Sequence, residues 1–121
     1  MIEMEYIITI TSTITYLFEA LSTQLPISIN FDLLNQILQD SNEDQVNSKE
    51  YLISQSGGIP EIKGLVSEYE PETLIITVNG FGRKQITTID KIIDSYIFSF
   101  GSGAHFRKDN ESLTLFKRML E

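Results

Sequence analysis

The sequence predicts an α+β fold in which an antiparallel or mixed sheet of about four to five strands carries helices packed on one face. Three observations indicate this fold: period-two alternation at the N-terminus, a group of β-prone runs in the middle of the chain, and helical apolar periodicity on either side of that group. A chain of 121 residues is expected to form one domain, residues 1–121.

The first element is predicted to be a strand at 3–11, because the apolar residues occupy alternate positions from Ile2 to Ile10. The segment 13–24 fits a helix with Ser12 as its N-cap. One strand continuing through residues 11–16 remains an alternative, since the alternation nominally extends that far.

A second helix is predicted at 31–39 with Asn30 as its N-cap, because an apolar stripe follows a residue type that caps helices well. The polar run 40–49 is predicted to be an exposed loop. A short strand candidate at 51–53 follows it and is stopped by glycines.

The middle of the chain is predicted to be a meander of strands at 62–69, 73–78 and 83–87. The pair Asn79-Gly80 is typical of a two-residue hairpin turn between the last two of them, because both turn positions need positive φ.

The clearest predicted helix spans 88–100 and carries an apolar stripe at helical spacing. A loop at 101–109 follows it, starting at the helix-ending residue Gly101. Asp109 or Asn110 is then expected to cap a final helix with an inner face formed by Leu113, Phe116, Met119 and Leu120.

The distribution of charge is uneven. The chain has 17 acids and 9 Lys or Arg, a formal net charge of −8, yet residues 1–48 contain no base at all. This balance argues against direct nucleic-acid binding, which requires clustered cations. The acidic part is instead interpreted as a surface for a partner protein with a basic surface, with these candidate residues: Glu3, Glu5, Glu19, Asp40, Glu43 and Asp44.

Two glycine-rich loops, 79–84 and 101–108, hold the candidates for binding an anion. These candidates are Arg83, Lys84, His105, Arg107 and Lys108. Both loops flank the predicted helix 88–100 at opposite ends, which disfavours one shared ligand because a helix of that length separates them by about 20 Å. The aromatic residues expected to be exposed are Phe81, Phe98 and Phe106.

No catalytic constellation is recognisable: the single His has no nucleophile and carboxylate at a known spacing, and there is no cysteine. We therefore expect no cofactor and no metal site, and the pattern favours a non-enzymatic protein while leaving enzymatic activity open. No export signal or membrane-spanning run is visible, so a cytoplasmic protein without membrane contact is expected.

Three functions stay open at this stage. The leading hypothesis is a non-enzymatic interaction module, a small acidic regulator, inhibitor or immunity-type factor. The second is a module for a small anionic ligand, such as a nucleotide or phosphometabolite, bound by the two glycine-rich loops. The third is a homo-oligomeric structural subunit, because several predicted strands offer free edges.

Overall fold

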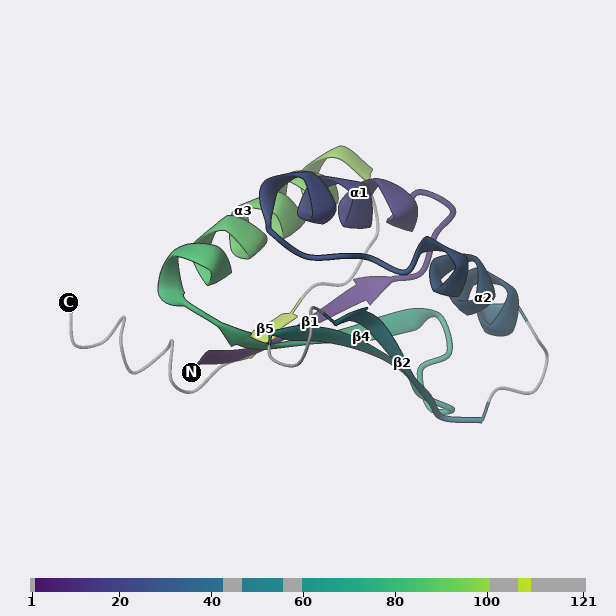
Figure 1. Cartoon of the computed structure of the whole chain (residues 1–121). Helices are drawn as coiled ribbons and strands as arrows, with labels where there is room; N and C mark the ends of the chain where they lie inside the picture. The colour runs from purple at the N-terminus through teal and green to yellow at the C-terminus, as the bar shows by residue number, and fades with distance from the viewer. Residues whose placement is uncertain (1, 43–46, 56–59, 101–106, 110–121) are drawn as a thin grey trace.

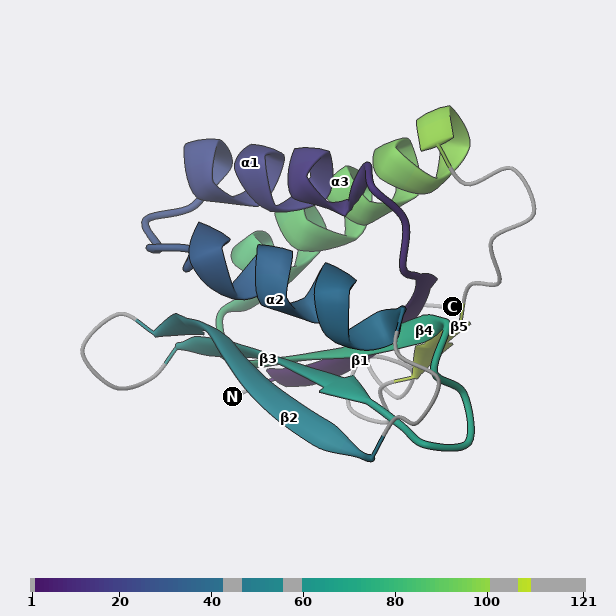
Figure 2. The same cartoon turned by 90° about the vertical axis from the view of Figure 1, so that its right-hand side faces the viewer.

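The computed structural model describes residues 2–42, 47–55, 60–100 and 107–109 of the chain. In this part, the three helices lie together on one face of the sheet (Figure 1 and Figure 2), so the predicted α+β class is confirmed. The elements follow in the order β1 (Ile2–Thr9), α1 (Ile14–Gln24), α2 (Phe31–Ser41), β2 (Lys49–Gln55), β3 (Glu61–Val66), β4 (Thr73–Phe81), α3 (Arg83–Phe100) and β5 (Arg107–Asp109).

The sheet has the strand order β2-β3-β4-β1-β5, and each of these neighbouring pairs is antiparallel. The N-terminal strand β1 therefore lies between β4 and β5, whereas β2, β3 and β4 form the predicted meander. β1 and β4 pair along their whole length, from Ile2 opposite Phe81 to Thr9 opposite Thr73. This long central pairing places the strand that precedes α1 beside the strand that precedes α3.

The core lies between the sheet and the helices. Alternate residues of β1 and β4 point into it, and α1 and α3 contribute their apolar stripes. Tyr6 is fully buried at the centre of β1, and its hydroxyl donates to Asp90 Oδ1 of α3 at 3.4 Å. Burial, together with the negative charge of Asp90, raises the pKa of Tyr6 well above its ordinary value.

The structure settles the alternative left open at residues 11–16, because α1 begins at Ile14 and residues 14–16 are helical. The predicted cap Ser12 is wrong: Thr13 occupies the N-cap position, and its side chain caps no helix N–H. The predicted cap of α2 is confirmed, since the Asn30 side-chain oxygen accepts from the Leu33 N–H at 3.2 Å.

The predicted hairpin after β4 is wrong. Asn79-Gly80 continues β4, where Asn79 pairs with both Glu3 and Glu61, and Gly80 takes its positive φ of 87° within the strand. The predicted strand 83–87 is instead the start of α3. The helix signal was present, because Ile86 lies three residues before Ile89 and is buried like it.

The local reason for the start of α3 is a cap at Gly82. Its N–H donates to the Gln85 side-chain oxygen at 3.1 Å, and its carbonyl accepts the first helical bond from Ile86 at 2.9 Å. A Gln that reaches back three residues in this way satisfies a donor that the helix leaves unpaired. Because Asn79 pairs with strands on both sides and Gly82 caps α3, the chain does not turn back at Asn79-Gly80.

The segment predicted as a connecting loop, 101–109, ends in the short strand β5, which pairs with β1 from Ile7 to Glu5. Residues 101–106, with Gly101, His105 and Phe106, lie outside the described residues. So does the predicted final helix, apart from its first candidate cap: Asp109 is part of β5.

The Ser54 hydroxyl is the one buried polar side-chain group of the described residues that has no hydrogen-bond partner there. Ser54 lies beside a register shift in β2 and forms an isolated antiparallel bridge with Ile29. Because an unpaired buried hydroxyl is destabilising, we expect Ser54→Ala to raise the free energy of unfolding by up to about 1 kcal/mol in urea denaturation. Ser48→Ala is the contrasting variant, since its hydroxyl accepts the Glu68 N–H at 3.2 Å. A loss of more than about 1 kcal/mol in Ser54→Ala would show that the hydroxyl is paired.

Candidate functional site

The face of the sheet opposite the helices is the first candidate site. Because side chains alternate along each strand, the residues between the core positions share this face. No described helix covers it (Figure 1 and Figure 2). We call it the outer sheet face and define it by Glu3, Glu5, Ile7, Glu50, Leu52, Glu61, Lys63, Leu65, Ile75, Thr77 and Asn79.

Strand register arranges the outer sheet face in rows. One row is mainly apolar, because Ile7 pairs with Ile75 and Ile75 pairs with Leu65. A second row runs from Glu3 through Asn79 to Glu61 at the other end of the strands. Between them lies a shallow hollow of about 240 Å³, which both rows line. The hollow is lined mainly by polar and charged residues, with Leu65 and Ile75 on its apolar side, so the face places one apolar row beside an acidic one.

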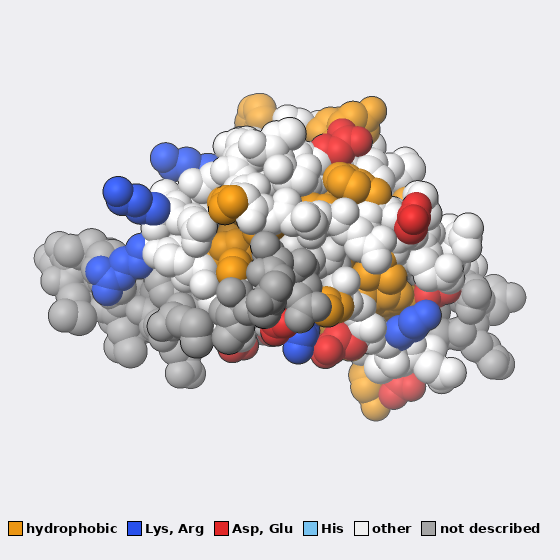
Figure 3. Space-filling model, in the orientation of Figure 1, with side chains coloured by type: hydrophobic (Ala, Val, Ile, Leu, Met, Phe, Trp, Pro, Cys, Tyr) orange, Lys and Arg blue, Asp and Glu red, His pale blue; other side chains and the backbone are white. Residues whose placement is uncertain are grey.

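Carboxylates dominate the charge of the outer sheet face. Among the residues that define this face, Glu3, Glu5, Glu50 and Glu61 carry four negative charges and Lys63 carries one positive charge. The register of β5 adds one charge of each sign, Arg107 opposite Ile7 and Asp109 opposite Glu5. Lys63 Nζ lies 3.8 Å from Glu50 Oε1 and 3.5 Å from Glu61 Oε1. Such exposed pairs are weak, so they leave the face with a net negative field. Figure 3 shows acidic, basic and hydrophobic side chains mixed along the lower edge of the molecule, where Figure 1 places the sheet.

The structure distributes the acidic residues predicted as a partner surface over several places. Glu3 and Glu5 lie on the outer sheet face, whereas Glu19 is exposed on α1, on the other side of the sheet. Glu43 and Asp44 lie outside the described residues. Among the described residues, the predicted set therefore does not form one continuous face.

Asp40 has a structural role at the end of α2. Tyr51 donates its hydroxyl to Asp40 Oδ2 at 2.5 Å, and Gln36 donates to Oδ1 at 2.8 Å. Lys49 Nζ lies 3.2 Å from Oδ2. The hydrogen bond from Tyr51 is the main reason that the pKa of the Asp40 carboxyl is lowered, and the contacts with Gln36 and Lys49 lower it further. These bonds tie α2 to β2 and use the oxygens that a partner would need.

Sequence reasoning missed Glu50 and Glu61 as members of the acidic face. Both lie beyond residue 48, in the part of the chain whose overall charge is nearly balanced, so the regional count did not single them out. Period-two alternation was the available signal, because it places Glu61, Lys63 and Leu65 on one side of β3. Only strand pairing shows that this side adjoins Glu3 and Glu5.

The candidate anion-binding residues lie in different elements. Arg83 and Lys84 are exposed in the first turn of α3, where basic side chains stand out at the left of Figure 3. Arg107 and Lys108 belong to β5, and His105 is outside the described residues. Arg107 pairs with Ile7, whereas Phe81, which lies just before Arg83 and Lys84, pairs with Ile2. The five residues from Ile2 to Ile7 separate these two positions by about 16 Å along β1. The shared anion site stays a prediction.

The aromatic candidates behave differently from one another. The prediction that Phe81 is exposed is wrong: its side chain is 1% exposed, because Phe81 lies in β4 and points into the core. Phe98 is 93% exposed on α3. Phe106 lies outside the described residues. Sequence reasoning missed Tyr16 and Phe100, which are both exposed and stacked on each other.

Comparison with known proteins finds no match. No family model matches the chain, and no similar protein is found among curated sequences or among solved structures. The candidate site therefore rests on geometry alone. In the described ranges, no three His, Cys, Asp or Glu residues gather as a metal site would require. No helix of those ranges is both long and apolar enough to cross a bilayer.

Proposed function

We propose that this chain is a non-enzymatic protein-interaction module, a small acidic regulator or inhibitor that binds a basic surface of another protein through its outer sheet face. The observation that carries this proposal is the joining of an apolar row with four carboxylates on one side of the sheet. Interfaces of this kind use apolar contact for affinity and charge for orientation.

The apolar part supports the proposal because of its position. Ile7, Ile75 and Leu65 are only partly buried although they sit in adjacent strands, and Leu52 of β2 is 41% exposed. A sheet face on which no described helix packs exposes such side chains to water, and a partner surface would remove that exposure.

The charge supports a basic partner. Four carboxylates beside one apolar row repel an acidic surface and attract Lys and Arg side chains before contact. Arg suits this site especially, because its planar guanidinium can pair with a carboxylate while its stem covers apolar surface. The expected complex forms rapidly at low ionic strength and weakens as salt is added.

A pair of matched double variants tests this proposal. Glu3→Gln with Glu50→Gln removes two charges from the outer sheet face, whereas Glu19→Gln with Asp32→Asn removes two exposed charges from the helical layer. A partner captured from cell extract is purified and titrated against both variants by calorimetry at about 50 mM and about 500 mM NaCl.

We expect the outer-face variant to bind at least about fivefold more weakly than the wild type at low salt, and the helical-layer variant to bind like the wild type. Hydrogen exchange of the complex should show added protection in β1, β3 and β4. Equal binding by both variants, or a complex that does not respond to salt, contradicts the proposal.

A further inference from the structure

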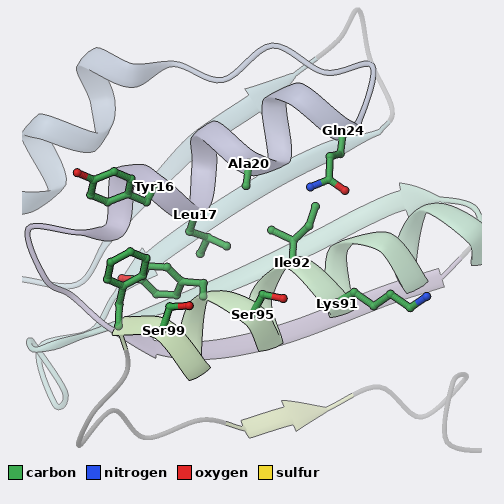
Figure 4. Close-up of a pocket in the computed structure, with 10 residues that line it drawn as sticks. Tyr16, Leu17, Ala20, Gln24, Lys91, Ile92, Ser95 and Ser99 are labelled. Carbon is green, nitrogen blue, oxygen red and sulfur yellow. The ribbon is translucent and has the colours of Figure 1, made fainter.

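A groove on the outer side of the helical layer forms a second, independent site (Figure 4). It runs between α1 and α3, has a volume of about 290 Å³, and lies on the opposite side of the molecule from the outer sheet face. On α1, its wall is formed by Leu17, Ala20 and Gln24, which share one helix face by their spacing. On α3, the opposing wall is formed by Ile92, Ser95 and Ser99, which have the same spacing.

Small side chains keep the groove open. Ala20 of α1 and the two serines of α3 fill little of the space between the helices, while Leu17 and Ile92 are buried below them. Figure 4 shows Ala20 and Ser95 on the two walls and Gln24 pointing into the groove. The result is an apolar floor with hydroxyl and amide groups along its sides.

One end of the groove is aromatic and firmly held. The Tyr16 and Phe100 rings stack with centroids 5.3 Å apart and an angle of 11° between their planes. Tyr96 lies behind them, 5.5 Å from the Phe100 ring, and its hydroxyl is within 3.2 Å of both Thr11 Oγ1 and Thr13 Oγ1. Because Tyr16 is 56% and Phe100 is 44% exposed, much of the aromatic surface remains available to a ligand.

The other end of the groove is polar and cationic. Gln24 of α1 and Lys91 of α3 line this end, and Lys91 is the only charged side chain among the residues that line the groove. Figure 4 shows the Lys91 side chain extending away from Gln24, so its flexible stem must turn toward the groove for its ammonium to meet a bound anion. No ion pair of Lys91 occurs within the described part of the chain. Lys91 and Phe100 are nine residues apart on one helix, so the two ends are separated by about 13 Å.

We propose that this groove binds a small amphipathic aromatic acid, with its ring against Tyr16 and Phe100 and its carboxylate at Lys91 and Gln24. Stacking favours a planar ring at the first end, and the ammonium favours an anion at the second. The volume lies at the lower limit of ordinary small-molecule pockets. A helix of a partner protein would be too large for this groove, because a helical segment about 13 Å long and about 10 Å in diameter occupies roughly 1,000 Å³.

Phenylalkanoates provide a direct test. The ¹⁵N-labelled chain of 121 residues is titrated with 3-phenylpropionate, 4-phenylbutyrate and 6-phenylhexanoate, and with 6-phenylhexanol as the uncharged analogue of the third. We expect saturable shifts of the Ala20, Ser95 and Ser99 amide signals. We also expect the longer acids to bind best, because they bridge the two ends, and the alcohol to bind about fivefold more weakly than its acid, a typical effect of one exposed charge contact.

Two variants separate the roles of the two ends. Lys91→Met should weaken 6-phenylhexanoate about fivefold and leave the alcohol unchanged, whereas Lys84→Met, an exposed lysine of the same helix outside the groove, should change neither. Ser95→Leu fills the groove from an exposed helix position and should abolish binding of both compounds, and Ala20→Leu provides the same test from the other wall.

The proposal is overturned if none of the probes gives saturable shifts, if the shifts map outside the groove, or if Lys84→Met weakens the acid as much as Lys91→Met does. Equal affinity for acid and alcohol also overturns it, because the carboxylate would then have no partner. None of these outcomes depends on the outer sheet face, so the groove and the protein-interaction proposal can fail separately.

Discussion

Replacing Gly64 by valine is expected to lower the free energy of unfolding by about 2 to 3 kcal/mol, in the range measured for overpacked cores. Gly64 lies in β3 on the core side of the sheet. A Cβ atom built there would lie 2.8 Å from Ile53 Cδ1 and 2.9 Å from Leu74 Cδ1, closer than side-chain carbons can approach. Valine adds two further methyl groups to that space, so neighbouring side chains must leave their preferred rotamers.

Urea denaturation of a small variant set checks this expectation. Gly64→Ala should be destabilised less than Gly64→Val, because the two methyl groups it meets are the flexible ends of their side chains. Gly82→Ala is the steric control and should cost no more than about 1 kcal/mol, the usual preference of an N-cap position for Gly over Ala, since its Cβ meets only Gln85 Oε1 at 4.0 Å.

A double-mutant cycle identifies the cause. Ile53→Val removes the Cδ1 atom at 2.8 Å, so combining it with Gly64→Ala should cost less than the sum of the two single changes. If Gly64→Val is as stable as the wild type, or if the two changes are strictly additive, steric exclusion at this glycine is not the reason for its presence.

Asp40→Ala is expected to lower the free energy of unfolding by about 2 kcal/mol at neutral pH, because hydrogen bonds to a charged group are the stronger kind. The change deletes the acceptor for Tyr51 and Gln36 and the counter-charge of Lys49. Tyr51 is buried, so its hydroxyl would lose this partner in a place that water reaches poorly.

The pH dependence of this effect has a defined sign. The pKa of Asp40 is lowered in the folded protein, so the folded state binds its proton less readily than the unfolded state does. Its contribution is therefore complete above the unfolded pKa of about 4 and is lost as the pH falls through the lower folded value.

Unfolding free energies at pH 7 and about pH 3 test the sign of this effect, with the difference between wild type and Asp40→Ala expected to shrink on acidification. Glu19→Ala, an exposed acid on α1, should show a small difference that stays nearly constant. An Asp40→Ala difference that is as large in acid as at neutral pH would falsify the assignment.

Local sequence patterns predicted most of the elements. Alternation in β1, the Asn30 cap of α2 and the apolar stripe of α3 each depend on residues a few positions apart. The two errors with the largest consequence, the hairpin at Asn79-Gly80 and the exposure of Phe81, lie at one place. There, a local turn preference competes with strand pairing to β1 and β3, and the pairing prevails.

The sequence by itself determined the fold class, the Asn30 cap of α2, the apolar stripes of the helices, and the acidic character of the first part of the chain, because these depend on composition and on near neighbours. Only the tertiary structure decided which acids share a face. Glu3 and Glu61 are brought near each other by their common partner Asn79, although 58 positions separate them along the chain. Likewise, the groove exists only because α1 and α3 place small residues opposite one another. Contacts between residues far apart in sequence have no periodic signature, so they become visible only once the strands and helices are packed.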